Sequence, residues 1–395
     1  MMKYMPTVLP KDIDKYFYDR KKYIKQINTN LEMLELDIAN QFLITGYRGV
    51  GKTALTKKII SNQPDKFLTT YVDISKIFAK KKGKPTEEEI LKEILKKINK
   101  TLLKRENILK RTKDNILNSI NKLKLKDYKF ENNDSLLDIP LPDIEDNYNK
   151  LSEFVMELPQ QIVDSNKNIK GYIIVIDEFQ LIQYVENPEA FFWLIRSYTQ
   201  EQYNVSYIFT GSASKTAEII NMINGQTGAF GGRMMQIDLK PFTKEETKTY
   251  IEKYSNNIRF NEEGFEQFYK CTRGIPAYIN SFCNILPNNE ICTPEILKNK
   301  LLLNTDQIAV IWLDVWGKLS ENEKEIIKLL IDKKQLSWTE LMNETGYSKA
   351  TVSKYISLLN NKGIIEFSNK KYVLTDKMLK TWLKNKEKME GQYPE

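Results

Sequence analysis

A glycine-rich segment at residues 46–53 has the composition and spacing of a phosphate-binding loop. It reads Gly-Tyr-Arg-Gly-Val-Gly-Lys-Thr, follows the short apolar run 41–45 and precedes a segment with helical spacing, 54–60. Glycines let the chain wrap closely round a polyphosphate, and the helix that follows adds its positive dipole end. Lys52 is then expected at the β- and γ-phosphates and the Thr53 hydroxyl on Mg²⁺. The predicted nucleotide contacts are Gly46, Tyr47, Arg48, Gly49, Val50, Gly51, Lys52, Thr53 and Ala54.

Two adjacent carboxylates end another apolar run further along the chain. Residues 173–176 are Ile-Ile-Val-Ile, which is typical of a strand buried on both faces of a parallel sheet, and Asp177 and Glu178 follow. Ligands of such sheets bind at the carboxyl ends of the strands. Together with the glycine-rich loop, the pair is interpreted as a Walker B motif. Asp177 would hold Mg²⁺ through its water shell and Glu178 would polarise the attacking water, so ATP and Mg²⁺ are the predicted cofactors.

Two later apolar runs are also predicted to be strands that carry polar groups to the same edge. The run 206–210 is followed by Gly-Ser, so Ser212, or alternatively Thr210, would bond the γ-phosphate or the attacking water. Arg233 stands at the entrance of the strand predicted within 229–239 and would stabilise charge on the transferred phosphoryl group. The alternative for Arg233 is an ion-paired surface side chain. Whether Arg233 acts on its own chain or on a neighbouring copy is left open.

The composition excludes several classes of function. Histidine is absent, which removes imidazole bases, Ser-His triads and His-ligated metals. The three cysteines, Cys271, Cys283 and Cys292, lack metal-ligand spacing and are expected to be free thiols. No apolar run approaches the roughly 18 residues of a membrane helix, and the N-terminus lacks the apolar stretch of a signal peptide. We therefore expect a cytoplasmic protein without a membrane partner.

The formal net charge of +8 is concentrated in the stretch Lys100–Lys126, which holds nine basic and two acidic residues. Contact with nucleic acid and a solvated helix face both explain such a run. The lack of interleaved aromatic residues favours the solvated face. This stretch belongs to a predicted insertion at about 80–150, where Thr86 and Glu89 form a capping box at the start of a helix. The acidic, proline-interrupted segment 131–146 is predicted to be a mobile loop.

Alternation of apolar runs with helical spacing predicts an α/β fold with a doubly wound parallel sheet over residues 1–240. At 241–308 the pattern is helical throughout, beginning at a capping box of Thr243 and Glu246, which predicts an all-α lid domain. Residues 309–395 contain two further capped helices, a third helix at 348–361 and an alternating hairpin at 364–374. This order predicts a winged helix.

The third helix and the hairpin of the predicted winged helix carry the candidate DNA contacts. A recognition helix would enter the major groove while the wing meets phosphate. Against DNA binding, this part has no large positive excess and its recognition face has no arginine to read guanine. Contact with double-stranded DNA and contact with a protein partner therefore both stay open. The candidate DNA residues are Ser348, Lys349, Thr351, Lys354, Lys370 and Lys371.

These motifs together resemble the archaeal ATPase family in the STAND branch of P-loop NTPases, related to AAA+ proteins and Orc/Cdc6-like initiators. The matching segments are the P-loop, 175–180, 210–212, the Gly-Arg at 232–233 that leads to Pro-Phe-Thr at 241–243, and Thr-Arg-Gly-Ile-Pro-Ala at 272–277. The resemblance implies that Pro276 lies against adenine and that Arg273 faces phosphate. The family usually has Gly-Arg-Glu before its first helix, and this chain shares only Arg20 of that motif.

The leading hypothesis is a slow ATPase switch in which Mg-ATP controls the position of the lid and the winged helix, acting on DNA or a protein partner. A homo-oligomer is compatible with the same pattern. The alternative is an initiator- or regulator-like DNA-binding protein with ATP as a largely static ligand. A metabolic kinase is disfavoured, because such enzymes do not need a winged helix.

Overall fold

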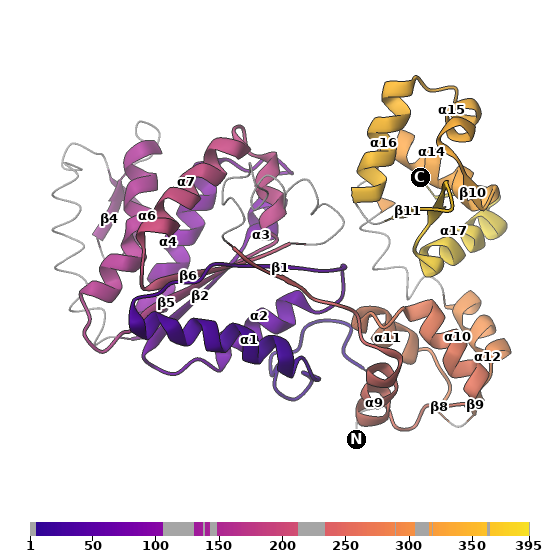
Figure 1. Cartoon of the computed structure of the whole chain (residues 1–395), viewed down its shortest axis with the longest axis horizontal. Helices are drawn as coiled ribbons and strands as arrows, with labels where there is room; N and C mark the ends of the chain where they lie inside the picture. Colours follow the sequence, from indigo (N-terminus) through magenta and orange to yellow (C-terminus); the bar gives the residue numbers. More distant parts are fainter. Residues whose placement is uncertain are drawn as a thin grey trace.

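The computed structural model describes residues 5–105, 130–136, 139–142, 148–211, 234–288, 290–304, 316–317, 319–361 and 364–394. An α/β part lies on one side of the molecule, and a helical part and a winged helix lie on the other (Figure 1). Of the sequence-based predictions, those for Ser212, Arg233 and most of the basic stretch, from 106 to 126, fall outside the described residues.

A five-stranded parallel sheet forms the centre of the α/β part, as predicted. Every neighbouring pair of strands is parallel, and the strand before the P-loop motif does not neighbour the Walker B strand. β6 lies between β1, which leads into the P-loop, and β5, which ends at Asp177. The strand order is β2 (Phe67–Asp73), β5 (Gly171–Asp177), β6 (Val205–Thr210), β1 (Phe42–Thr45) and β7 (Met235–Asp238).

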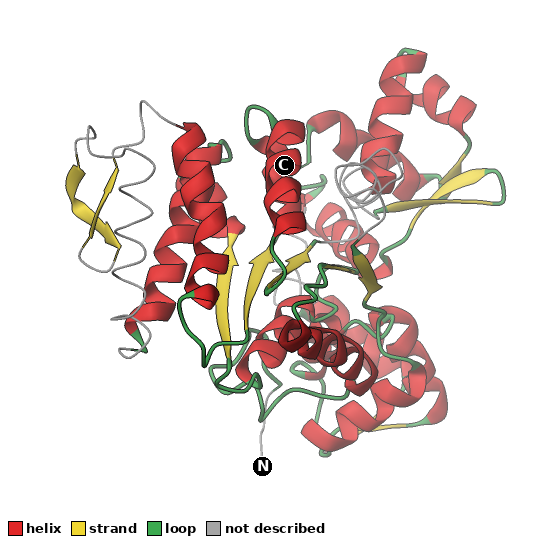
Figure 2. Cartoon of the chain, turned by 60° about the vertical axis from the view of Figure 1, so that its left-hand side comes forward, coloured by secondary structure: helices red, strands yellow, loops and turns green. Residues whose placement is uncertain are grey.

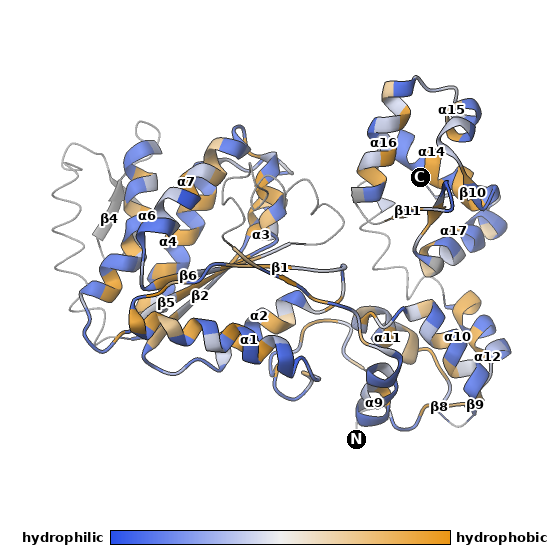
Figure 3. Cartoon of the chain, in the orientation of Figure 1, coloured by the Kyte–Doolittle hydropathy of each residue, from blue (hydrophilic) through white to orange (hydrophobic). Residues whose placement is uncertain are grey.

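Helices cover both faces of this sheet (Figure 2), and the strands between them are apolar (Figure 3). Alternate residues of β5 enter different clusters: Ile173 and Val175 pack with α1 and α2, whereas Ile174 and Ile176 face the other layer. This is the period of two that a strand imposes. One layer contains α1 (Lys21–Leu31) and α2 (Lys52–Ser61), and the other contains α4 (Glu87–Leu103), α6 (Tyr148–Asp164) and α7 (Pro188–Glu201).

The insertion follows the sequence-based prediction in its first half only. Thr86 accepts from the backbone N–H of Glu89, and the Glu89 carboxylate accepts from that of Thr86, so the predicted capping box begins α4. The predicted loop at 131–146 is wrong over most of its length, because β3 (Phe130–Leu136) and β4 (Ile139–Pro142) form an antiparallel pair. Backbone pairing does not require apolar side chains, so acidic composition was a poor guide.

A helical part follows β7 and begins, as predicted, with a capping box of Thr243 and Glu246. The sequence-based boundaries of the domains stay a prediction, and the name lid is used here for the helices α9–α12. A short parallel pair of two-residue strands joins their loops. The elements of the lid are α9 (Lys244–Tyr254), β8 (Arg259–Phe260), α10 (Glu262–Thr272), α11 (Pro276–Cys283), β9 (Ile291–Cys292) and α12 (Pro294–Leu303).

The C-terminal part is the predicted winged helix with two additions. Its hairpin gains a third strand, β10, and a last helix, α17, follows the hairpin and contacts α10 and α12 of the lid; the sequence pattern predicts neither. The two helices expected to be capped begin with capping boxes, of Ser320 with Glu323 and of Ser337 with Glu340. The elements are α14 (Glu321–Asp332), β10 (Gln335–Leu336), α15 (Trp338–Thr345), α16 (Lys349–Asn361), β11 (Ile365–Ser368), β12 (Lys371–Leu374) and α17 (Lys377–Glu390).

The lid and the winged helix share one hydrophobic cluster, whereas the sheet has a separate cluster on each face. Phe268 and Phe282 of the lid belong to the same cluster as Trp382 and Leu383 of α17. A shared core couples the two parts mechanically. The three cysteines are free thiols, as predicted. Among the described residues, no helix combines the length and apolarity needed to cross a bilayer.

Candidate nucleotide-binding site

The polar residues singled out in the sequence meet at the carboxyl edge of the parallel sheet. Asp73 pairs in register with Asp177, and Ile44, two residues before the P-loop, pairs with Thr210. Parallel strands present their carboxyl ends at one edge, and there the P-loop, the Walker B carboxylates and the end of β6 come together. The P-loop and β5 lie two strands apart, with Thr210 between them.

The P-loop backbone takes conformations that favour glycine. Gly46 and Gly49 have φ angles of 148° and 78°. A Cβ on Gly46 would lie 2.6 Å from the carbonyl oxygen of Leu239, and one on Gly49 would lie 2.7 Å from Cβ of Ala277 in the lid. The backbone N–H of Ala277 also donates to the carbonyl of Gly49 at 3.2 Å. The P-loop is therefore packed tightly against the N-terminus of lid helix α11.

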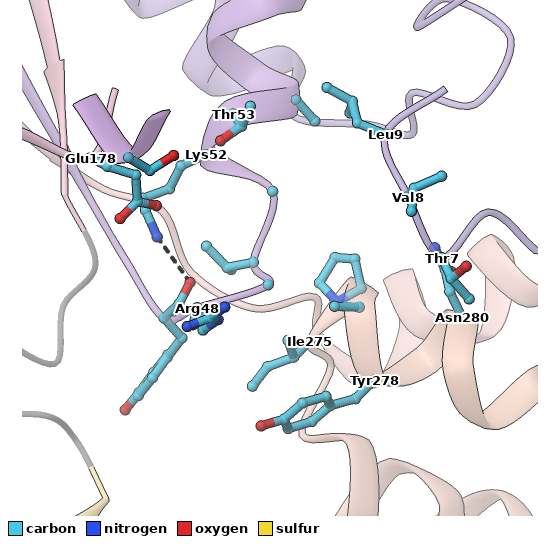
Figure 4. A pocket seen from close by; sticks show the side chains of 18 of the residues that line it. Thr7, Val8, Leu9, Arg48, Lys52, Thr53, Glu178, Ile275, Tyr278 and Asn280 are labelled. Carbon is cyan, nitrogen blue, oxygen red and sulfur yellow. Dashed lines mark hydrogen bonds between the residues drawn. The ribbon is translucent and has the colours of Figure 1, made fainter. Parts of the chain in front are cut away.

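Lys52 lies in the position that the motif predicts, at the first residue of α2. Its side chain is 7% exposed, and its Nζ donates to the carbonyl oxygens of Gly46 at 3.0 Å and Tyr47 at 3.2 Å (Figure 4). Burial lowers the pKa of Lys52, while the negative charges of Glu178 and Asp177 act in the opposite direction. The ammonium group is thus held inside the loop next to two carboxylates, where an anionic ligand would compensate its desolvation.

Asp177 receives hydrogen bonds from three strand ends and one helix. The hydroxyl of Thr53 donates to its Oδ2 at 2.7 Å, and the hydroxyls of Tyr71 on β2 and Thr210 on β6 donate as well. The backbone N–H of Glu178 donates to Oδ1 at 3.0 Å. Burial and the Asp177 charge raise the pKa of Tyr71, which keeps its hydroxyl a donor. A carboxylate held by so many donors has one defined orientation.

Glu178 follows in a left-handed backbone conformation, with φ 57° and ψ 37°. Such a conformation is unfavourable for a residue with a side chain, and it often marks functional sites. Here it turns the chain from β5 into the 3-10 helix Phe179–Tyr184 and directs the Glu178 side chain to the cavity wall, where Figure 4 shows it beside Lys52. The geometry fits the predicted role of Glu178 at the attacking water.

The cavity at this edge has a volume of about 1540 Å³ and borders on every part of the molecule. It exceeds the roughly 300–1,000 Å³ usual for a small-ligand site. Lys52, Thr53 and Glu178 line it from the sheet. Arg273 and Pro276 line it from the lid, and Thr375 and Asp376 from the winged helix are among the rest of its wall. All the predicted contacts from Tyr47 to Ala54 border the cavity, while Gly46 is tied to it through Lys52.

Two predicted arginines contact protein groups in this state. The Arg20 guanidinium donates to the Val50 carbonyl at 3.2 Å and lies 4.3 Å from the ring centroid of Phe242, which joins the P-loop to the lid. Burial lowers the pKa of Arg20. Arg273 lies 5.6 Å from the ring centroid of Tyr47, and its Nη1 donates to the Thr375 carbonyl at 3.1 Å. Arg273 thus reaches both the P-loop and the winged helix.

An N-terminal segment, which the sequence interpretation did not include, forms another wall of the cavity. Figure 4 shows Thr7, Val8 and Leu9 on the opposite side of the P-loop from Glu178. Two asparagines fix the segment to the lid, one within α11 and one directly after it. Asn280 donates to the Pro6 carbonyl at 2.8 Å, and Asn284 exchanges two hydrogen bonds with the Met5 backbone. Hydrogen bonds between an asparagine side chain and a distant backbone segment leave no pattern in the sequence, so this contact could not be predicted from it.

The candidate DNA residues form an exposed surface away from the cavity. Lys349 and Lys354 are exposed on α16, and Lys370 is exposed at the wing tip, where it has a φ of 62°. Thr351 is half-buried, and Ser348 accepts from its backbone N–H, so Ser348 also helps to cap α16. Lys371 differs from the expectation of a free wing-tip lysine, because its Nζ lies 3.4 Å from a Glu340 carboxylate oxygen.

The sequence interpretation missed Tyr71 and the main role of Thr210. Both donate to Asp177. Tyr71 stands in none of the predicted motifs, and Thr210 stands in the segment 210–212 but is expected there at the γ-phosphate or the attacking water. A signal existed for Thr210, at the end of the strand predicted at 206–210, since the ends of parallel strands meet at one edge. The register of those strands, which the sequence does not give, decides which of them reach Asp177.

Comparisons with solved structures show the fold. A Walker-type ATPase of Pyrococcus abyssi aligns with a TM-score of 0.66 and 17% identity, covering 96% of this chain and 100% of that one. The ORC2 protein of Aeropyrum pernix, solved in ADPNP and ADP complexes, aligns with a TM-score of 0.55 and 12% identity, covering 96% and 98%. No curated protein sequence matches this chain.

Two family models match different parts of the sequence. A model described as winged helix-turn-helix DNA-binding matches residues 319–366, which contain α14, α15 and α16. A model described as an ATPase domain predominantly from Archaea matches residues 17–282, from the segment before α1 to lid helix α11. The second match spans more than half of the chain and includes the P-loop, both Walker B carboxylates and Arg273. The chain therefore belongs to this family of predominantly archaeal ATPases.

Proposed function

We propose that this ATPase is a nucleotide-controlled switch, in which Mg-ATP at the P-loop sets the position of the lid and the winged helix, and that the winged helix acts on double-stranded DNA. The observation that carries the proposal is the position of Arg273. This one side chain lies over Tyr47 of the P-loop and donates to the Thr375 carbonyl of the winged helix. A change at the phosphates would therefore reach the winged helix directly through Arg273, beside the hydrophobic cluster that joins the lid to the winged helix.

The physical basis is competition for the Arg273 guanidinium. Its present acceptor, the Thr375 carbonyl, is neutral, whereas an anionic phosphate would add direct attraction between opposite charges to the hydrogen bond. A γ-phosphate beside Tyr47 would draw the side chain toward the P-loop. A second contact, from the Tyr278 hydroxyl to the Asp376 carboxylate, joins the same two parts. By linkage, DNA that moves the winged helix would change nucleotide affinity by the same factor.

The lid and the winged helix are expected to move together. They share one hydrophobic cluster, so their separation would expose apolar surface. Their contacts with the α/β part include the Gly49–Ala277 hydrogen bond, Arg20 against Phe242, and the Tyr254 hydroxyl on the Phe17 carbonyl. The cavity is larger than a nucleotide requires, which leaves room for the two bodies to close on the ligand.

ATP and Mg²⁺ are the cofactors that the residues fit best. The Thr53 hydroxyl, which borders the cavity, lies 2.7 Å from Asp177 Oδ2, so two hard oxygen ligands stand side by side. Among the described residues no group of three His, Cys, Asp or Glu side chains could hold a metal alone, so the ion would arrive with the phosphates. Bound there, Mg²⁺ would neutralise phosphate charge. Tyr18, Phe242, Tyr250 and the segment 6–10 give the lid side an apolar wall suited to adenine.

The features of the winged helix favour DNA as its target. The lysines of α16 and the wing tip are exposed, and the family model for this part is described as DNA-binding. Lys349, Lys354 and Lys370 are the phosphate contacts that we expect. None of the three borders the nucleotide cavity, so DNA and ATP would not compete for space.

The test is the affinity for a mixed-sequence duplex with ATP, with ADP and without nucleotide, across a salt series. Wild-type protein should show a nucleotide-dependent affinity and a steep salt slope. Arg273→Ala should bind the duplex but lose most of the difference between ATP and ADP. Arg259→Ala, an exposed lid arginine, is the matched control and should keep that difference.

Two results would reject the switch. Equal DNA affinity with ATP and ADP, together with negligible turnover, would support a DNA-binding protein with static nucleotide. No duplex binding near physiological salt would turn the search to a protein partner of the winged helix.

A further inference from the structure

Gln180, two residues after Glu178, contacts the Glu178 carboxylate. It is 5% exposed and borders the cavity, and its Nε2 donates to Glu178 Oε2. The orientation of the amide follows from chemistry, because an ionised carboxylate accepts hydrogen bonds and does not donate them. Nε2 must therefore face Glu178, and Oε1 must point the other way.

The outward-facing Oε1 of Gln180 is buried and has no hydrogen-bond partner in the part of the chain that the structure describes. Its neighbour is the backbone of Gly211, where an added Cβ would lie 3.3 Å from Oε1. A buried acceptor without a partner destabilises a fold. A methionine of similar length would fill the same space without that cost. Packing alone therefore gives no reason for an amide at this position.

The segment that carries both side chains is firmly anchored. Phe179, between them, is 1% exposed, and its ring centroid lies 4.2 Å from that of Phe209 and 5.4 Å from that of Phe192. The left-handed backbone of Glu178 adds a second constraint. With the backbone fixed, the remaining freedom of Glu178 lies in its side-chain torsions, and the contact with Gln180 restricts them.

We propose that Gln180 is a positioning residue for ATP hydrolysis: its Nε2 holds the Glu178 carboxylate in the direction required to polarise the attacking water. The proposal rests on the role proposed for Glu178 in hydrolysis. Gln180 acts through Glu178 and need not contact ATP. Its loss should therefore slow the chemical step and leave nucleotide binding intact, since a small misplacement of a catalytic group lowers rates strongly.

The experiment compares Gln180→Met with Gln202→Met in the full-length protein. Gln202 is also buried and donates to the carbonyl of Met156, and among the described residues its Oε1 has no hydrogen-bond partner, but it lies outside the cavity. Gln180→Met should lower kcat at least tenfold, with ATP Kd within about twofold of wild type and an unchanged or higher Tm. Gln202→Met should keep the wild-type kcat. Gln180→Asn, which keeps the amide but shortens its reach, is the second variant if the methionine protein folds poorly.

A double-mutant cycle separates positioning from a general structural effect. If Gln180 acts through the Glu178 carboxylate, Gln180→Met should slow a Glu178→Gln protein by less than about twofold. Wild-type kcat in Gln180→Met, or full additivity of the two losses, would overturn the proposal. Wild-type turnover in Glu178→Gln alone would instead show that Glu178 has no role in hydrolysis. This failure is distinguishable from failure of the Gln180 proposal, because it is measured on a protein with an intact Gln180.

Discussion

The nucleotide site and the DNA-facing surface of the winged helix differ in how their charged groups are held. At the nucleotide site Lys52 and Asp177 are 7% and 3% exposed, and protein atoms fix both side chains. On the winged helix, Lys349 and Lys354 are exposed on α16 and project from a single element. Buried polar groups must be paired in one geometry, whereas exposed lysines keep their rotamer freedom. Side chains held in one geometry favour catalysis at the nucleotide site. Mobile exposed lysines favour binding to a polyanion of variable shape.

Lys52→Ala should have the largest effect on the nucleotide site, because it removes the buried cation of the P-loop. We expect ATP affinity to fall by roughly two orders of magnitude or more, as a desolvated charge-assisted contact to phosphate is lost. Isothermal titration with ATP measures it. Lys58→Ala is the control, since Lys58 lies on the same helix and pairs with Asp14 at the surface. Wild-type affinity in Lys52→Ala would show that the P-loop assignment is wrong.

Glu178→Gln should separate binding from hydrolysis at the same site. The variant keeps the shape of the side chain but removes the negative charge that polarises water, so turnover should fall about 10²-fold or more. ATP binding should persist, because Lys52 and the P-loop are intact. Single-turnover hydrolysis and an equilibrium binding assay measure the two quantities on the same protein. Unchanged turnover would remove Glu178 from its proposed role.

A pair of glycine substitutions compares the two regions directly. Gly49 and Gly346 have φ angles of 78° and 68°, but a Cβ would lie 2.7 Å from Ala277 Cβ at Gly49 and would meet no atom within 4 Å at Gly346. Gly49→Ala should weaken ATP binding by on the order of tenfold by pushing the lid from the P-loop. Gly346→Ala should cost about 1 kcal/mol of unfolding free energy through backbone strain and leave ATP affinity unchanged. Equal ATP affinities in both variants would contradict the P-loop–lid contact.

Single lysine substitutions on the winged helix should have the smallest effects. Lys349→Ala, Lys354→Ala and Lys370→Ala should each weaken duplex binding by roughly two- to fivefold and lower the salt slope by about one. Lys371→Ala should have less effect, because Lys371 already pairs with Glu340. Fluorescence anisotropy across a salt series measures both quantities. A loss as large as that in Lys52→Ala from one lysine would mean that this surface is also a preorganised site.

The sequence by itself determined the features that depend on neighbouring residues. The P-loop glycines, the capping boxes at Thr86, Thr243 and Ser320, and the apolar strand that ends in Asp177 all follow from short spacings. Their physics is local: a backbone angle that favours glycine, a side chain that bonds to the third residue on, a strand with two buried faces.

Tertiary structure alone decided the contacts between distant segments. Strand order and register place the hydroxyls of Tyr71 and Thr210 on Asp177, and packing of the lid against the winged helix places Arg273 at the Thr375 carbonyl. Local spacing contains no information on these pairs, because they depend on which surfaces are buried together. The predicted loop at 131–146 failed for the same reason, since strand pairing across β3 and β4 is not encoded in acidic composition. The motifs therefore supply the chemical groups, and the packed fold gives them their partners.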